Sequence, residues 1–116
     1  RFNDRHTGES LGVMVKEIVE RHGGELKPVI SGEPFLTPPG DFSDIIAGAI
    51  REVTGIDPEL STSGGTSDAR FLAKIMPVVE FGLCNATMHK LDEAVAIDDL
   101  EKVAQIYALV VKRALL

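Results

Sequence analysis

Residues 31–40 divide the chain into two parts, and this break limits what the first part can form alone. The stretch reads Ser-Gly-Glu-Pro-Phe-Leu-Thr-Pro-Pro-Gly, and its proline and glycine content predicts a loop or linker. Only 30 residues precede it. A strand, a helix and a second strand of that total length bury too little apolar surface to be stable by themselves. We therefore expect the first part to pack against another segment of chain or against a partner.

The first part has the pattern of a β-α-β unit. Apolar residues at the spacing i, i+3, i+4, i+7 predict an amphipathic helix over residues 10–22, with Thr7 as its N-cap. These apolar residues are Leu11, Met14, Val15 and Ile18. Strand-like segments over residues 1–6 and 25–30 flank the helix, and Pro28 places the second at a sheet edge.

The second part predicts three further helices and two short strands. In chain order these are a helix over 41–54, a strand over 59–62, a helix over 68–76, a buried strand over 77–81 and a last helix over 98–115. Asp41 or Ser43 is the expected N-cap of the first of these helices, and Asp98 of the last. The order β-α-β, linker, α-β-α-β-α is typical of the α/β class.

Charge and composition exclude several classes of function. With 12 basic and 18 acidic residues the net charge is −6, which argues against a nucleic-acid partner. No apolar run approaches the roughly 20 residues of a membrane span. Cys84 is the only cysteine, so neither an intramolecular disulfide nor a cysteine-based zinc site forms within the chain, and a reducing cytosol fits. The first residue is Arg1 rather than Met, so we expect a piece of a longer protein.

Two polar loops carry the chemistry that the chain offers. Residues 63–68 form a Ser/Gly-rich loop, and residues 85–93 place an amide, a hydroxyl, an imidazole and two carboxylates directly after an apolar run. We expect the two loops to meet and His89 to be a metal ligand, since a neutral imidazole is a good zinc donor. The alternative is a hydrogen-bonded structural histidine. Ser67 has no local histidine partner, which argues against a catalytic triad.

Four motifs in order resemble the C-terminal part of the succinyl-diaminopimelate desuccinylase family, bacterial di-zinc amidohydrolases related to acetylornithine deacetylase. They are Ser-Gly-Glu-Pro-Phe at 31–35, Ser-Gly-Gly-Thr-Ser-Asp-Ala-Arg-Phe at 63–71, Val-Val-Glu-Phe-Gly at 78–82 and Asn-Ala-Thr-Met-His-Lys-Leu-Asp-Glu at 85–93. The opening Arg-Phe-Asn-Asp-Arg-His-Thr-Gly also resembles a lid strand of that family. The match covers essentially the whole chain.

The resemblance implies a fragment of a two-domain enzyme. Residues 1–37 would be the C-terminal part of an α+β lid and dimerisation domain, and residues 38–116 the C-terminal part of an α/β catalytic domain. Two zinc ions, for which cobalt could substitute, would bind in the full-length active site. The general base and the other zinc ligands would belong to the missing half, so no catalytic base is expected here and the fragment alone is expected to be inactive. A cytoplasmic homodimer would form through the lid.

The resemblance also assigns roles to individual residues. His89 matches the last zinc ligand, and Asp92 and Glu93 would orient it. Substrate-binding positions are Arg5, Ser31, Gly32, Gly65, Thr66 and Asn85. Alternatives remain. The glycines at 64 and 65 could serve only a tight turn, and the two acids could be a solvated charge run. Arg5 could form a surface ion pair with Asp4 or Glu9, and Arg1 is a competing candidate for its substrate-binding role. Arg70 is expected to be structural, and His6 and His22 are poor candidates for zinc ligands.

The reaction implied is hydrolysis of the succinyl amide of N-succinyl-LL-2,6-diaminopimelate to succinate and LL-2,6-diaminopimelate, in bacterial lysine and diaminopimelate synthesis. Acetylornithine deacetylase and aminoacylase activities are the nearest alternatives. A non-catalytic α/β dimerisation module is an alternative of another class, and it predicts that chelators change nothing.

Overall fold

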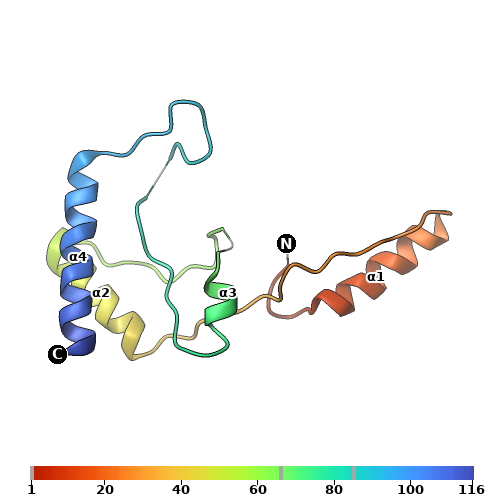
Figure 1. The fold of residues 1–116 in the computed structure, drawn as a ribbon, viewed down its shortest axis with the longest axis horizontal. Coiled ribbons are helices and arrows are strands. Elements are labelled where there is room, and N and C mark those ends of the chain that lie inside the picture. The colour runs from red at the N-terminus through yellow and green to blue at the C-terminus, as the bar shows by residue number, and fades with distance from the viewer. Residues whose placement is uncertain (1, 66, 85) are drawn as a thin grey trace. The chain divides into compact units, whose positions relative to one another are not determined.

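The computed structural model describes residues 2–65, 67–84 and 86–116, and over these ranges the secondary structure is helical (Figure 1). The helices are α1 (Gly8–Arg21), α2 (Asp41–Thr54), α3 (Ala69–Leu72) and α4 (Ile97–Leu115). The chain divides into two compact units. The first contains Arg1–Thr37 and Ser63–Pro77, and the second contains Pro38–Thr62 and Val78–Leu116.

The predicted strands are not formed in the described part of the chain. Residues 2–6, 25–30, 59–62 and 77–81 lack the backbone pairing that defines a strand. A strand needs a neighbour to satisfy its N–H and C=O groups, and no described segment supplies one. The helical half of the α/β prediction is therefore confirmed, whereas its sheet is absent from these residues.

Helix α1 begins two residues earlier than predicted, and its predicted cap is confirmed. The Ser10 amide donates to Oγ1 of Thr7 over 3.0 Å, and the Thr7 amide donates to Oγ of Ser10 over the same distance. Serine thus fills the place that glutamate usually takes in a capping box. The amide of Gly8 donates to Oε2 of Glu33 over 2.9 Å, so a distant carboxylate meets the positive end of the helix.

Two glycines of α1 differ sharply in the space around them. A Cβ atom added at Gly8 would lie 2.7 Å from Cγ2 of Ile30 and 2.9 Å from its Cδ1, whereas one added at Gly12 would meet nothing within 4 Å. The extended segment after α1 therefore packs directly on the backbone at Gly8.

Replacing each of the two glycines with alanine should change the free energy of unfolding, with opposite signs at the two positions. Gly8→Ala should lower the free energy of unfolding by about 1–3 kcal/mol, because Ile30 is β-branched and has to move as a whole. Gly12→Ala should raise it by about 0.5–1 kcal/mol, because alanine is the better helix former. Urea unfolding of the 116-residue chain, followed by far-ultraviolet circular dichroism, measures both. Equal effects of the two substitutions would contradict this packing.

The second unit is built on the contact between α2 and α4, which lie side by side (Figure 1). Its core consists of Ile46, Ala49, Ile50 and Ile106. Ala49 is fully buried and Ile106 is 2% exposed, so a small residue on one helix receives a branched one from the other. Arg113 of α4 forms an ion pair with Glu52 of α2 at the edge of this contact.

The predicted N-caps of the second part are wrong by one to three residues. Gly40 caps α2, because the Ser43 hydroxyl donates to the Gly40 carbonyl over 2.7 Å and accepts from its amide over 2.9 Å. Ala96 caps α4, and Asp98 lies in the first turn, where its charge favours the helix dipole.

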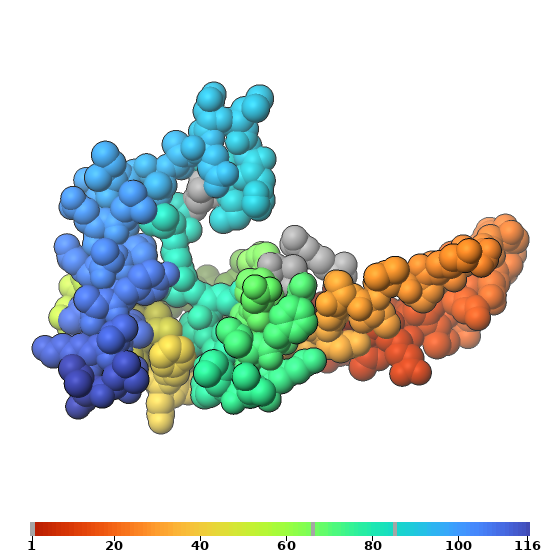
Figure 2. All heavy atoms as spheres, viewed as in Figure 1, coloured from red at the N-terminus to blue at the C-terminus, as the bar shows by residue number. Residues whose placement is uncertain are grey.

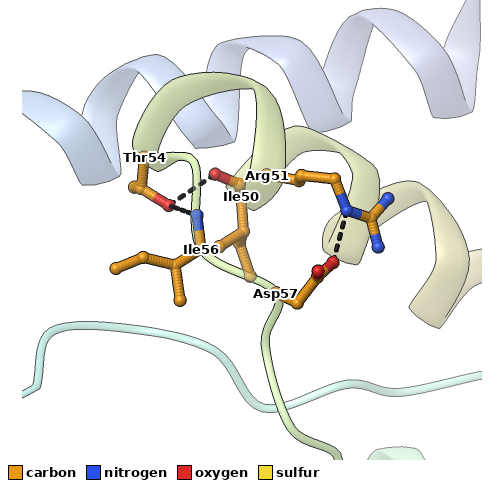
Figure 3. Close-up of polar contacts among 5 residues, drawn as sticks. All are labelled: Ile50, Arg51, Thr54, Ile56 and Asp57. Atoms are coloured by element: carbon orange, nitrogen blue, oxygen red, sulfur yellow. Dashed lines mark hydrogen bonds and ion pairs between the residues drawn. The ribbon is translucent and has the colours of Figure 1, made fainter.

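The end of α2 is closed by a single hydroxyl. Oγ1 of Thr54 donates to the Ile50 carbonyl over 2.7 Å and accepts from the Ile56 amide over 3.1 Å (Figure 3). The next residue, Gly55, has a φ of 72°, the left-handed conformation that ends many helices. Arg51 and Asp57 pair beside this turn (Figure 3).

Helix α3 is shorter than predicted, with four residues in place of nine over 68–76. The Ala69 amide donates to Oγ of Ser67 over 3.0 Å, which gives Ser67 a structural role. Arg70 lies with its guanidinium carbon 4.8 Å from the centre of the Phe71 ring.

Candidate metal and substrate site

The loop that carries His89 is closed by Thr87. Oγ1 of Thr87 donates to the carbonyl of Ala94 and accepts from the amide of the same residue, each over 3.0 Å. Inside the loop the Lys90 amide donates to the Thr87 carbonyl over 2.9 Å, which forms a turn. The Lys90 ammonium donates to the Ala86 carbonyl over 2.8 Å. Residues 86–94 are therefore held by several bonds, although most of the loop is exposed.

His89 lies at the tip of this loop in an uncommon conformation. Its φ is 61°, and that of Asp92 is 57°, so two non-glycine residues adopt the left-handed region within four positions. Each costs roughly 1–2 kcal/mol relative to the right-handed conformation. The imidazole is exposed and makes no hydrogen bond to any described residue. The loop thus holds a strained histidine with both ring nitrogens open to a ligand.

An aromatic contact connects the segment before this loop to the core of the second unit. The hydroxyl of Tyr107 on α4 donates to the Phe81 carbonyl over 2.9 Å. The two rings pack edge to face, with centroids 5.9 Å apart and an interplanar angle of 89°. In the space-filling view the loop, in light blue, projects from the helices of its own unit (Figure 2).

In the first unit, the side chain of Arg70 lies on the segment that holds the predicted substrate-binding residues Ser31 and Gly32. A Cβ atom added at Gly32 would lie 3.0 Å from Cδ of Arg70, so the Arg70 side chain rests on the backbone beside Ser31. Ser31 and Gly65 are exposed, and Gly32 is half-buried. Arg5 is exposed in a turn in which its amide donates to Oδ1 of Asn3 over 3.2 Å.

Part of the predicted site lies outside the described residues. Thr66 and Asn85 lie outside the described residues, as does Arg1. The loops at 63–68 and 86–93 belong to different units, so their meeting stays a prediction. The substrate-binding and metal-binding roles of the individual residues also stay predictions.

The described residues do not form a complete metal site. Among residues 2–65, 67–84 and 86–116 no group of three or more His, Cys, Asp or Glu side chains is placed to hold one ion. A catalytic zinc needs about three protein ligands. His89 has the chemistry of one such ligand, and its role as a metal ligand stays a prediction. An open groove of about 580 Å³ lies in the first unit between α1 and the segment after it. None of its lining residues is a predicted site residue, although Ile30 and Glu33 flank Ser31 and Gly32. No described helix is both long and apolar enough to cross a membrane.

The sequence matches the model of a known protein family. The model of peptidase family M20/M25/M40 matches residues 5–113, nearly the whole chain. The chain belongs to this family.

Individual proteins are also highly similar to this chain. A succinyl-diaminopimelate desuccinylase of Erythrobacter litoralis is 64% identical over 115 residues, which cover 99% of this chain and 30% of that protein. A protein of the same name from Novosphingobium aromaticivorans is also 64% identical, over 99% of this chain and 31% of its own length. A protein of the same name from Rhizorhabdus wittichii is 62% identical, over 99% of this chain and 31% of its own length. The resemblance drawn from the four motifs is thereby confirmed, and the chain spans about 30% of the length of these relatives.

Sequence reasoning missed two features of this M20/M25/M40 chain. It placed Thr87 in the loop motif and gave it no role, although a threonine two residues before a candidate ligand is well suited to bond the backbone across a loop. It also missed the Glu33 carboxylate at the start of α1, for which no local pattern exists because 25 residues separate the partners.

Proposed function

We propose that this chain is the C-terminal part of a zinc-dependent succinyl-diaminopimelate desuccinylase of bacterial lysine and diaminopimelate synthesis. The observation that carries the proposal is 62–64% identity, over 99% of the chain, to three proteins of that name. Residues 1–37 belong to the lid and dimerisation domain, and residues 38–116 to the catalytic domain. The extended segments at 2–6, 25–30, 59–62 and 77–81 are the strands of an α/β fold whose neighbouring strands come from the rest of the protein.

His89 is the zinc ligand that this chain contributes. Support comes from an exposed imidazole, held on a strained and closed loop, that makes no hydrogen bond to a described residue. Zinc, or cobalt in its place, would act as a Lewis acid on the amide carbonyl and supply a water of lowered pKa. The carboxylates of Asp92 and Glu93 follow His89 closely in sequence and act as its orienting partners.

The remaining residues bind the charged ends of the substrate. The backbone of Gly65, the hydroxyl of Thr66 and the amide of Asn85 offer hydrogen-bond donors to carboxylates. Arg5 supplies a guanidinium suited to bidentate carboxylate binding, and it acts with Ser31 and Gly32 from the lid. Hydrolysis breaks the amide C–N bond of N-succinyl-LL-2,6-diaminopimelate, with the water oxygen going to the succinyl carbon and the proton to the leaving nitrogen. The general base for this transfer comes from outside the chain.

The full-length enzyme is a cytoplasmic homodimer joined through the lid. Large apolar side chains exposed on the first unit support a protein interface there, because patches of this kind usually mark one. They are Val13, Met14, Ile18 and Val29. Relatives from several bacteria support a bacterial source.

A substrate panel tests the proposed activity. The full-length protein should hydrolyse N-succinyl-LL-2,6-diaminopimelate with a kcat/KM at least about 100-fold above that for N-acetylornithine or an N-acetylated amino acid, since a site built for charged and hydrogen-bonding groups rejects analogues that lack them. Removal of zinc by a chelator should abolish turnover. A preference for N-acetylornithine would transfer the proposal to the related deacetylases. Unchanged turnover after chelation would contradict the zinc-dependent mechanism.

A further inference from the structure

The closed loop around His89 contains a residue whose contribution the proposed function does not explain. Thr87 is half-buried in a loop that is otherwise largely exposed. Its hydroxyl both donates to and accepts from the backbone of Ala94, seven residues away, each over 3.0 Å. One side chain thus satisfies both polar groups of a backbone residue, as a neighbouring strand would do.

The two left-handed residues lie between the ends of this clamp. His89 and Asp92 both fall within residues 87–94, with φ of 61° and 57°. Such conformations persist in non-glycine residues only where surrounding contacts determine them. The bonds from Thr87 to Ala94 fix the separation of the loop ends, and the bond from the Lys90 amide to the Thr87 carbonyl fixes the turn that contains His89.

We propose that the Thr87 hydroxyl is a positioning group for His89, which keeps the histidine in its left-handed conformation and so aims its imidazole at the metal. The inference rests on the proposed function, in which His89 binds zinc. If the clamp opened, the backbone at His89 would be free to return to negative φ, and a change of that size redirects the Cα–Cβ bond. The imidazole would then leave the position that zinc requires.

The chain offers a matched control for the loss of a hydroxyl. Thr54 makes the same pair of bonds, one donated to a carbonyl and one accepted from an amide, at the end of α2 (Figure 3). It is also half-buried, and it has no assigned part in metal or substrate binding. Thr54→Val and Thr87→Val therefore remove the same atoms from similar surroundings, and only one of them lies beside His89.

The experiment compares wild type, Thr87→Val, Thr87→Ser and Thr54→Val in the full-length protein. The readouts are zinc per chain, zinc affinity by competition with a chelator, thermal midpoint, and kcat and KM separately. Thr87→Val should bind the zinc at His89 about 10- to 100-fold more weakly and lose kcat by a similar factor, with KM changed less than about threefold. Thr87→Ser, which keeps the hydroxyl, should restore both. Thr54→Val should lower the thermal midpoint and leave zinc affinity as in wild type.

Several outcomes would overturn the inference. Wild-type zinc affinity in Thr87→Val would show that the hydroxyl does not position His89. An equal loss in Thr54→Val, or a Thr87→Val protein that does not fold, would make the effect one of general stability. If these results appear while the wild type binds zinc and hydrolyses the succinyl amide, only the inference fails. A wild type without zinc overturns the proposed function and the inference together.

Discussion

His89→Ala in the full-length protein should lower kcat for succinyl-amide hydrolysis by more than about 100-fold, because changes to groups that merely orient a metal ligand already cost 10- to 100-fold. Alanine leaves no donor atom at the tip of the loop, and the described residues offer no neighbouring His, Cys, Asp or Glu cluster that could replace it. Steady-state hydrolysis of N-succinyl-LL-2,6-diaminopimelate measures the loss.

His22→Ala is the control for this substitution. Nδ1 of His22 donates to the Ile18 carbonyl over 2.8 Å at the end of α1, so this imidazole has a structural partner and no assigned role in the site. Its removal should leave kcat within about twofold of wild type, as is usual for surface positions. Retention of full activity by His89→Ala, or an equal loss in both variants, would refute the ligand assignment.

The 116-residue chain by itself is expected to be inactive. One imidazole does not hold a catalytic zinc, which needs about three protein ligands, and the described residues contain no group of three or more His, Cys, Asp or Glu side chains placed to hold one ion. We expect the general base to come from the rest of the protein. The isolated chain should carry substoichiometric zinc after gel filtration and show no hydrolysis above that of buffer. Stoichiometric zinc together with turnover would overturn the view that this chain forms only part of an active site.

Helix formation was largely predictable, because its signals are local. The apolar faces of α1, α2 and α4 and the cap at Thr7 follow from residues a few positions apart. The errors at Gly40 and Ala96 arose because neither residue has a side chain that caps a helix, whereas polar residues follow each of them in the first turn. Ser43, for example, bonds back to Gly40 from the first turn instead of capping the helix itself.

The strands and the geometry of the site were not predictable in this way. The segments at 25–30 and 77–81 have strand-like composition, but a strand exists only when a second backbone lies beside it. The left-handed conformations of His89 and Asp92 lie between the ends of a bond from Thr87 to Ala94, seven residues apart, which composition does not specify. The motif around His89 therefore predicts which residues form the site, and the structure shows how Thr87 and Lys90 bond within the loop.

We propose above all that His89 is one ligand of a two-zinc site shared with the rest of the protein. Metal analysis of the purified full-length protein beside His89→Ala tests it most directly. We predict two zinc ions per chain in the wild type and one in the variant. The same zinc content in both proteins would contradict the claim.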